Sequence, residues 1–414
     1  MGLWIDDDDL FAIPFKFSPN AKRLRFTSLS LNYRLSLWEV GIDGSGLRQL
    51  PSGFQQDEGE CCGRWSADGR YYFFAFHRGR TDIWALREKA GMFRPGSPDP
   101  FPITTGPLNY FSPAAALAGN RLFVVGEQQR GQLERLDLKS QQFVPFLHGI
   151  SAGQTDFSRD GKWVTYISYP DNLLWRSRSD GGEKLQLTYA PVEVAGPHWS
   201  PDGRQITYLC ELPGKPPKIC TVSADGGVSE EVEMDDQHWH DDPQWFPDGR
   251  SLIVALYPPG LINTKPQDVA ISQFDLKTKQ TTSLPGSEGM VGPRVSPDGR
   301  YISTLSADFK KMMLLELSTR KWSELATGVV LQNPNWSHDG KFVYLEDLGA
   351  DGLEIDRISL GTGKKERVAI LKGISQVPVP GTGVPWNGVA PDGSPLIMRD
   401  VGIHELYSLE LQLP

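Results

Sequence analysis

The 414-residue sequence has no long hydrophobic run. A membrane-spanning helix needs roughly 18 or more consecutive apolar residues, so we predict no membrane span. The N-terminus, MGLWIDDDDLFAIPF, also lacks a basic region followed by an apolar one, and we predict no signal peptide. As written, the chain is expected to stay in the cytoplasm. A native N-terminus longer than this one would instead be compatible with a periplasmic or membrane-tethered protein.

Cysteine is scarce, with four residues, and this excludes a disulfide-stapled secreted scaffold of this size. Cys61 and Cys62 are adjacent and are expected to be poor partners for each other. Cys210 and Cys220 would lie roughly opposite each other on a hairpin centred near Lys215. A cross-strand disulfide is one alternative there. We expect instead two buried thiols that pack as small hydrophobic groups.

Basic residues are in the minority, because 42 Lys and Arg face 51 Asp and Glu for a net charge of −9. Nucleic-acid-binding proteins usually carry a basic stripe, whereas the basic clusters here are short, as in HRGR (77–80) and GKK (363–365). We therefore predict no direct binding of DNA or RNA.

Linear catalytic motifs are missing as well. DGSGL at 43–47 has Asp where the G-x-S-x-G nucleophile motif requires Gly. No glycine-rich loop that could hold a phosphate precedes a helix. We predict a non-catalytic protein without a cofactor, although an active site assembled from scattered loop residues keeps the enzyme alternative open.

Glycine (43 residues) and proline (32) are abundant, and many of them belong to a repeated turn. An Asp-Gly pair stands between a short apolar segment and an alternating one, with a period of about 40 to 50 residues that is typical of propeller blades. Two degenerate copies lie around Asn20 and Gly119. The aspartates of the clear copies are Asp68, Asp160, Asp202, Asp248, Asp298, Asp339 and Asp392.

Each repeat unit predicts four strands. In HWSPDGRQITYL (198–209), Pro201 presets the turn, Asp202 can bond to its own backbone and Gly203 supplies the left-handed conformation. The residues that follow alternate between two semi-apolar faces, as expected for a blade between two others. A second polar turn follows about 20 residues later, and no helical periodicity of useful length is found. The prediction is an all-β chain of four-stranded antiparallel blades.

We expect one propeller over residues 17–414, preceded by an N-terminal segment (1–16) that is either a closing strand or disordered. Eight blades are favoured, with seven or nine as alternatives. The last unit supplies only three strands, so residues 10–17 or part of the first unit are expected to complete it.

WSPDGR (199–204), LWRSRSDGG (174–182) and LQLT (185–188) resemble the TolB-like family of bacterial propellers, which are related to WD repeats. The resemblance extends from about residue 17 to the end. Stretches such as TTGPLNYFSP (104–113) also resemble the propeller half of acidobacterial-type proteins, in which a winged helix precedes TolB-like repeats. The resemblance implies a scaffold for binding a protein or a ligand.

Candidate binding residues come from loops expected on the top face of the ring. The densest polar cluster is EMDDQHWHDDPQW (233–245), and His198 stands at the comparable place in the preceding unit. His77 and Arg80, in another loop, are candidates for binding an anionic group. A divalent metal held by His238, His240 and Asp242 is an alternative to a purely hydrogen-bonding loop. The candidates from the cluster are His238, Trp239, His240, Asp241 and Asp242.

Three functions remain open at this point. The first is a monomeric, non-catalytic scaffold that binds a protein or peptide partner through its top-face loops. The second is the sensor or interaction half of a larger winged-helix regulator. The third is a metal-dependent hydrolase or lyase that uses the cluster at 233–242.

Overall fold

The computed structural model describes residues 9–30, 35–50, 59–77, 80–88, 100–118, 120–212, 215, 217–234, 238–258, 265–350, 352–379 and 384–413. These residues form nine antiparallel sheets, eight of four strands and one of three. The all-β prediction is confirmed, and the sheets are consistent with propeller blades. No helix among the described residues is long and apolar enough to cross a membrane.

The sheets divide between two compact units, rather than forming the one eight-bladed ring expected from the sequence. One unit comprises Met1–Gln129, Pro213–Lys215 and Gly402–Pro414, and the other comprises Arg130–Leu212 and Pro216–Val401. Three sheets belong to the first unit and six to the second. The local repeat is the same in both, so the repeat alone did not reveal the division.

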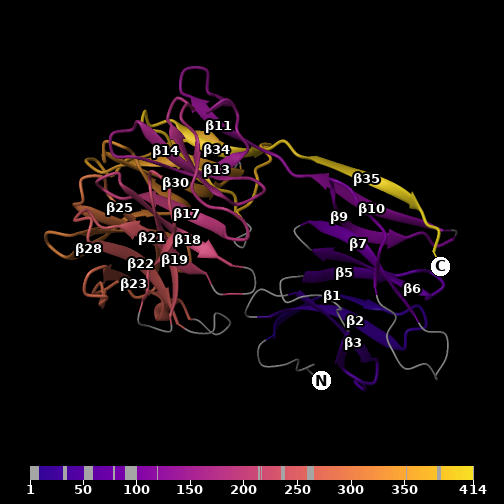
Figure 1. Ribbon diagram of the computed structural model, residues 1–414. Helices are drawn as coiled ribbons and strands as arrows, with labels where there is room; N and C mark the ends of the chain where they lie inside the picture. The colour runs from indigo at the N-terminus through magenta and orange to yellow at the C-terminus, as the bar shows by residue number, and fades with distance from the viewer. Residues whose placement is uncertain are drawn as a thin grey trace. The chain divides into compact units, whose positions relative to one another are not determined.

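The first unit stacks its three sheets in chain order, because β5 lies against the first sheet and also against β9 of the third. The strand that completes the third sheet, β35, comes from the C-terminus and pairs with β10 (Figure 1). The strands are β1 (Asp9–Phe17), β2 (Arg23–Ser30), β3 (Leu35–Gly41), β4 (Arg48–Gln49), β5 (Gly59–Trp65), β6 (Tyr71–His77), β7 (Thr81–Arg87), β8 (Phe101–Pro102), β9 (Asn109–Ala115), β10 (Arg121–Gln128) and β35 (Ile403–Glu410).

The second unit is a closed ring of six sheets, which we call the six-sheet ring. The first strands β13, β17, β21, β25, β29 and β33 contact one another in turn, and β33 returns to β13. Five sheets are continuous in sequence: β13 (Ala152–Phe157), β14 (Trp163–Ser168), β15 (Leu174–Arg178), β16 (Leu185–Gln186); β17 (Glu193–Trp199), β18 (Gln205–Glu211), β19 (Lys218–Ser223), β20 (Glu230–Glu231); β21 (Trp239–Trp245), β22 (Ser251–Tyr257), β23 (Ala270–Asp275), β24 (Thr281–Ser283); β25 (Met290–Val295), β26 (Tyr301–Ser306), β27 (Lys311–Glu316), β28 (Lys321–Thr327); β29 (Gln332–Trp336), β30 (Phe342–Gly349), β31 (Gly352–Ser359), β32 (Lys365–Ile370). A short 3₁₀ helix, η2 (Pro266–Asp268), precedes β23.

The sixth sheet closes the ring by joining two distant segments. β33 (Asn387–Val389) and β34 (Pro395–Asp400) pair with β11 (Gly131–Asp137) and β12 (Gln142–Pro145), in the order β12-β11-β34-β33. The prediction that residues 10–17 complete the last unit is therefore wrong. Those residues belong to β1, which pairs with β2 in the first sheet of the other unit.

The repeated turn is held by one serine and one aspartate side chain. In the copy at 200–205, Ser200 Oγ donates to Asp202 Oδ1 (2.7 Å), and the backbone N–H of Gln205 donates to Ser200 Oγ (2.9 Å). These bonds connect the end of β17 to the start of β18, and the bond from Ser200 lowers the pKa of Asp202. The same Ser–Asp bond recurs at Ser66–Asp68, Ser158–Asp160, Ser296–Asp298 and Ser337–Asp339.

A buried arginine joins the first two sheets of the three-sheet unit. Arg25 is 2% exposed, and its guanidinium carbon lies 4.8 Å from the ring centroid of Trp65 and 4.5 Å from that of Tyr72. Its charge is balanced by Glu39 (Nη2–Oε2 2.7 Å) and Glu88 (Nη1–Oε1 2.5 Å). Tyr72 is itself 1% exposed, so its ring is enclosed by neighbouring residues as well as covered by the guanidinium of Arg25.

The four cysteines differ from the expectation of free thiols. Cys210 and Cys220 form a disulfide with their Cα atoms 5.8 Å apart, and Cys61 and Cys62 form a second one between adjacent residues. Cys220 lies opposite Tyr208 in the ladder between β18 and β19, while Cys210 lies opposite Lys218. The hairpin was predicted, and the cross-strand disulfide between Cys210 and Cys220 is the alternative that was left open; the favoured free thiols, and the expectation that Cys61 and Cys62 are poor partners, are wrong.

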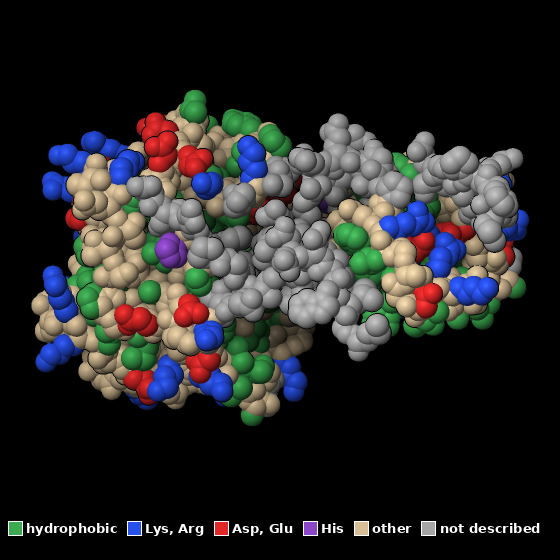
Figure 2. Space-filling view, turned by 90° about the horizontal axis from the view of Figure 1, so that it is seen from below, with side chains coloured by type: hydrophobic (Ala, Val, Ile, Leu, Met, Phe, Trp, Pro, Cys, Tyr) green, Lys and Arg blue, Asp and Glu red, His purple; other side chains and the backbone are tan. Residues whose placement is uncertain are grey.

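On the face shown in Figure 2, Lys and Arg side chains are interspersed with Asp and Glu side chains over the described residues. Among the described residues of that face, charges of both signs alternate, so no field of a single sign extends over them.

Candidate functional site

The first strands of five sheets in the six-sheet ring share an irregularity that was not predicted. Each has a register shift against its second strand, which marks a β-bulge. At each bulge one residue has a left-handed backbone, with φ between 48° and 60°. These residues are Gln154, Gly196, Asp242, Gly292 and Asn333.

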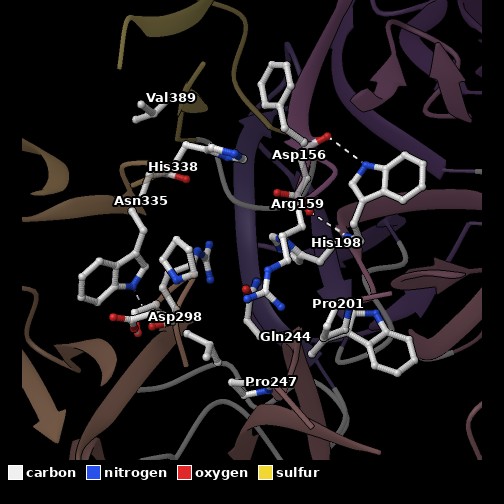
Figure 3. A pocket seen from close by; sticks show the side chains of 18 of the residues that line it. Asp156, Arg159, His198, Pro201, Gln244, Pro247, Asp298, Asn335, His338 and Val389 are labelled. Carbon is white, nitrogen blue, oxygen red and sulfur yellow. Dashed lines mark hydrogen bonds and ion pairs between the residues drawn. The ribbon is translucent and has the colours of Figure 1, made fainter. Parts of the chain in front are cut away.

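The bulges position a set of side chains around a central cavity. Two residues after each bulge residue stands a side chain that lines a cavity of about 450 Å³. The cavity is lined by the ends of the first strands and by the repeated turns that follow them, and Figure 3 shows these side chains converging from all round the ring. The five equivalent side chains are Asp156, His198, Gln244, Arg294 and Asn335.

A polar network connects four of the sheets at this level. His198 Nδ1 lies 3.6 Å from Asp156 Oδ2, and His198 Nε2 lies 3.9 Å from Asp242 Oδ1. Asp242 also forms an ion pair with Arg294. The imidazole therefore stands between carboxylates of its two neighbouring sheets, and the charges of Asp242 and Arg294 compensate each other.

Tryptophans hold the sheets behind the cavity in a fixed position. The indole N–H of Trp199 donates to the carbonyl of Asp156 (3.1 Å), and its backbone N–H donates to Asp156 Oδ2 (2.7 Å; dashed in Figure 3). Trp336 makes the equivalent indole bond to the carbonyl of Arg294 (3.0 Å). Each bond crosses from one sheet to the next, so the lining residues are held by rigid elements.

Two carboxyl groups lie side by side next to this network. Burial, and then the negative charge of Asp242, raise the pKa of Asp241 to about 6. Burial and the same two carboxylates also raise the pKa of Tyr257 on the adjoining strand. Asp241 does not line the cavity, and a raised carboxyl pKa of this kind is found in functional sites and in structural networks alike.

The turns at the cavity contribute two side chains where the other copies have proline. Position two of the Ser-Pro-Asp-Gly pattern is Pro201, Pro247, Pro297 and Pro391 in four sheets. In the remaining two it is Arg159 and His338, which are exposed and line the cavity. Among the residues that the structure describes, neither side chain has a hydrogen bond or ion pair.

Of the sequence-predicted site residues, His198 and Asp242 are brought together, and Asp241 lies next to Asp242 in β21 without lining the cavity. His198 lines the cavity. The carboxylate of Asp242, in the bulge of β21, lies 3.9 Å from the imidazole of His198. His240 lies earlier in the same strand, in register with Leu256, and His238 is an exposed residue just before it. The backbone of Trp239 begins β21, and its side chain is outside what the structure describes.

His77 and Arg80 lie elsewhere, in the three-sheet unit. Arg80 Nε pairs with Asp82 Oδ2 (2.8 Å), and its Nη1 donates to the carbonyl of Gly106. His77 Nδ1 lies 3.2 Å from Thr81 Oγ1. Arg80 therefore fastens a hairpin, and the two residues do not join His198 in one site.

The metal alternative receives no support from the geometry. In the described part of the chain, no group of three or more His, Cys, Asp or Glu side chains is arranged to hold a metal ion. Asp242, the carboxylate proposed as a ligand, is engaged by Arg294 instead. Asp235 and Asp236, from the same cluster, lie outside the described residues.

Five residues of the cavity were not predicted: Arg159, Gln244, Arg294, Asn335 and His338. The predicted residues came from the loops before the first strands, whereas the cavity is lined by the far ends of these strands and the turns after them. A comparison of the repeats with one another contains the signal. In five of the six sheets the residue four positions before the turn aspartate is Asp, His, Gln, Arg or Asn. The position before it is Pro in four of these five sheets, and the position after it is Trp in three.

Comparisons with known proteins support the fold. The structure is similar to that of a protein assigned as TolB from Agrobacterium tumefaciens, with a TM-score of 0.50 and 19% sequence identity over 66% of this chain and 99% of that one. No known protein-family model matches the sequence.

Two curated relatives match parts of the chain. The "Uncharacterized protein Atu1656" of Agrobacterium fabrum is 29% identical over 154 residues, which are 34% of this chain and 50% of that protein. The "Uncharacterized peptidase YuxL" of Bacillus subtilis is 25% identical over 116 residues, which are 26% of this chain and 17% of that protein. The chain thus spans half or less of the length of these relatives. With the nine repeated sheets, the structural comparison shows that this chain has the fold of the TolB-like β-propellers.

Proposed function

We propose that the six-sheet ring binds a segment of a protein or peptide partner in its central cavity, without chemical conversion. The observation that carries this proposal is the variety of the side chains at one equivalent position. Residues that maintain the repeat are themselves repeated, as with Trp199, Trp245 and Trp336. The cavity position instead carries Asp156, His198, Gln244, Arg294 and Asn335.

A repeated fold needs no such variety, because an identical side chain could pack at every copy. Five different polar groups on one level give the cavity an asymmetric pattern of donors and acceptors. Such a pattern fixes the orientation of a bound segment, as expected of a preformed binding site. The volume of about 450 Å³ suits one or a few side chains of a partner rather than a folded domain.

The proposal is tested by panning random short peptides on the immobilised protein and repeating the binding with a filled cavity. Val389 lines the cavity on β33, and Val389→Trp would occupy part of it. The matched control is Leu138→Trp, on an exposed turn of the same sheet. We expect Val389→Trp to weaken binding at least tenfold, about 1.4 kcal/mol, and Leu138→Trp to leave it unchanged. Equal binding by both variants would reject the cavity as the site.

A further inference from the structure

We infer that the cavity receives a negatively charged group of the partner, a carboxylate, between Arg159 and His338. This inference rests on the proposed function and names the chemistry that the partner must present. Both residues line the cavity and point into it (Figure 3). They replace proline in two of the six equivalent turns, so neither residue is needed to form the turn.

The two side chains come from turns that lie close together. A Cβ atom added to Gly161, two residues after Arg159, would lie 3.6 Å from Pro391 Cβ and 4.0 Å from His338 Nε2. Pro391 belongs to the sheet between those of Arg159 and His338 in the ring. The turns that carry the guanidinium and the imidazole therefore adjoin each other on one side of the cavity.

The acidic groups that line the cavity are already occupied. Asp298 accepts hydrogen bonds from Ser296 Oγ (2.7 Å) and from Arg300 Nε (2.6 Å). Asp339 accepts from Ser337 Oγ (2.7 Å) and lies 3.1 Å from Lys341 Nζ. Asp156 accepts the backbone N–H of Trp199 (2.7 Å) and faces His198. Each of these three carboxylates thus already has partners within the protein, whereas the hydroxyl of Thr155 has none among the described residues.

Four side chains of the lining have donors without a partner among the described residues. Arg159 and His338 donate to nothing in the described chain. Gln244 is 8% exposed, and its Nε2 has no hydrogen-bond partner among the described residues. The same holds for Arg294 Nε. Because buried donors are stabilised by acceptors, this surplus favours a ligand that brings oxygen acceptors, and the guanidinium of Arg159 favours an anionic one.

A carboxylate fits this arrangement better than a cation. A Lys or Arg side chain of the partner would meet carboxylates that already have partners within the protein, and it would stand beside the charge of Arg159. A carboxylate oxygen could accept from Arg159, with His338 as a second donor. A free C-terminus and an acidic side chain both supply this group, and the experiment separates them.

The test compares three libraries of short random peptides: one with a fixed Glu and an amidated end, one with a fixed Lys and an amidated end, and one neutral with a free carboxyl end. Arg159→Pro and His338→Pro, together, restore the residue of the other four turns. No hydrogen bond from either backbone N–H is present among the described residues, so both changes suit the turn. The control is Arg204→Gln, an exposed arginine just after an equivalent turn that does not line the cavity.

We expect the wild type to retain Glu or free-carboxyl peptides roughly tenfold more than Lys peptides, since a charge-assisted pair contributes on the order of a tenfold difference. The double variant should lose this preference, and Arg204→Gln should keep it. Which of the two anionic libraries is enriched identifies the source of the carboxylate. Retention of all libraries alike overturns the inference and leaves the proposed function standing. Retention of none of them overturns both.

Discussion

Arg294 and Asp242 form an ion pair between two neighbouring sheets of the six-sheet ring, and the aspartate belongs to a β-bulge. Both side chains are about four-fifths buried. Asp242 also stands next to Asp241, whose ionised form is disfavoured at this place. The positive charge of Arg294 thus offsets the negative charge of two neighbouring carboxyl groups where two sheets of the ring meet.

Replacing Arg294 with Met should destabilise the six-sheet ring. The change leaves the partly buried carboxylate of Asp242 without its cation, which we expect to cost about 2 kcal/mol. The midpoint of urea unfolding measures the effect. Arg300→Met, which breaks an exposed pair with Asp298, should cost less than about 0.5 kcal/mol. Equal effects of the two changes would contradict a role for the pair in ring stability.

Asp241 predicts a pH dependence of stability. Its pKa is raised to about 6 in the folded protein, so the folded state binds more protons than the unfolded state between about pH 4 and pH 6. The free energy of unfolding should therefore fall as the pH rises through 6. Asp241→Asn should remove this fall and raise stability at pH 7.5 by at most about 3 kcal/mol. Parallel urea titrations at pH 5 and 7.5 test the sign; a variant that loses stability only at the higher pH would refute it.

The serine of the repeated turn should control the ionisation of the following aspartate. The hydrogen bond from Ser66 Oγ (2.6 Å) is the largest cause that lowers the pKa of Asp68 to about 2. Ser66→Ala should raise this pKa toward its usual value, as followed by carboxyl carbon chemical shifts during an acid titration. It should also cost about 1 kcal/mol of stability above pH 4, because Tyr71 N–H loses its acceptor. An unchanged Asp68 titration would show that the arginine and backbone bonds suffice.

Gly63 should not tolerate a side chain. A Cβ atom there would lie 2.5 Å from Tyr72 Oη and closer still to two ring carbons, and Tyr72 is held in place beneath Arg25. We expect Gly63→Ala to destabilise the three-sheet unit by about 2 kcal/mol or more. In the control, Gly361→Ala, the new atom meets nothing within 4 Å and the change should be neutral or slightly stabilising. Equal thermal unfolding midpoints for the two variants would be inconsistent with this packing.

The turns and the alternating strands could be predicted because their causes are local. Pro201, Asp202 and Gly203 determine a turn within a few residues, and the structure has that turn. The pairing of β11 with β34 could not be predicted in this way. It joins Gly131 to Asp400, and nothing in either segment specifies a partner so distant in sequence.

The bulges were missed for a related reason. Left-handed backbone is expected at glycine, whereas Gln154, Asp242 and Asn333 adopt it here in the bulges of their first strands. His198 and Asp242 were selected as polar residues near a strand and do meet in the site. Arg159 and His338 were overlooked because each is ordinary in its own turn and unusual only beside the prolines of the other copies.

The pairing of β10 with β35 makes the six-sheet ring an insertion between two adjacent strands of another sheet. The ends of the ring meet, since the backbone N–H of Val401 donates to the carbonyl of Arg130 (2.9 Å). During translation, β35 therefore leaves the ribosome on the order of 10 to 60 s after β10, because the whole ring is synthesised between them. The third sheet of the three-sheet unit cannot be completed before then. The same interval separates β11 from β34, so a single late stretch of polypeptide completes both halves of the molecule. A chain that ends before residue 387 would lack β33, β34 and β35, so both the six-sheet ring and the three-sheet unit would be incomplete.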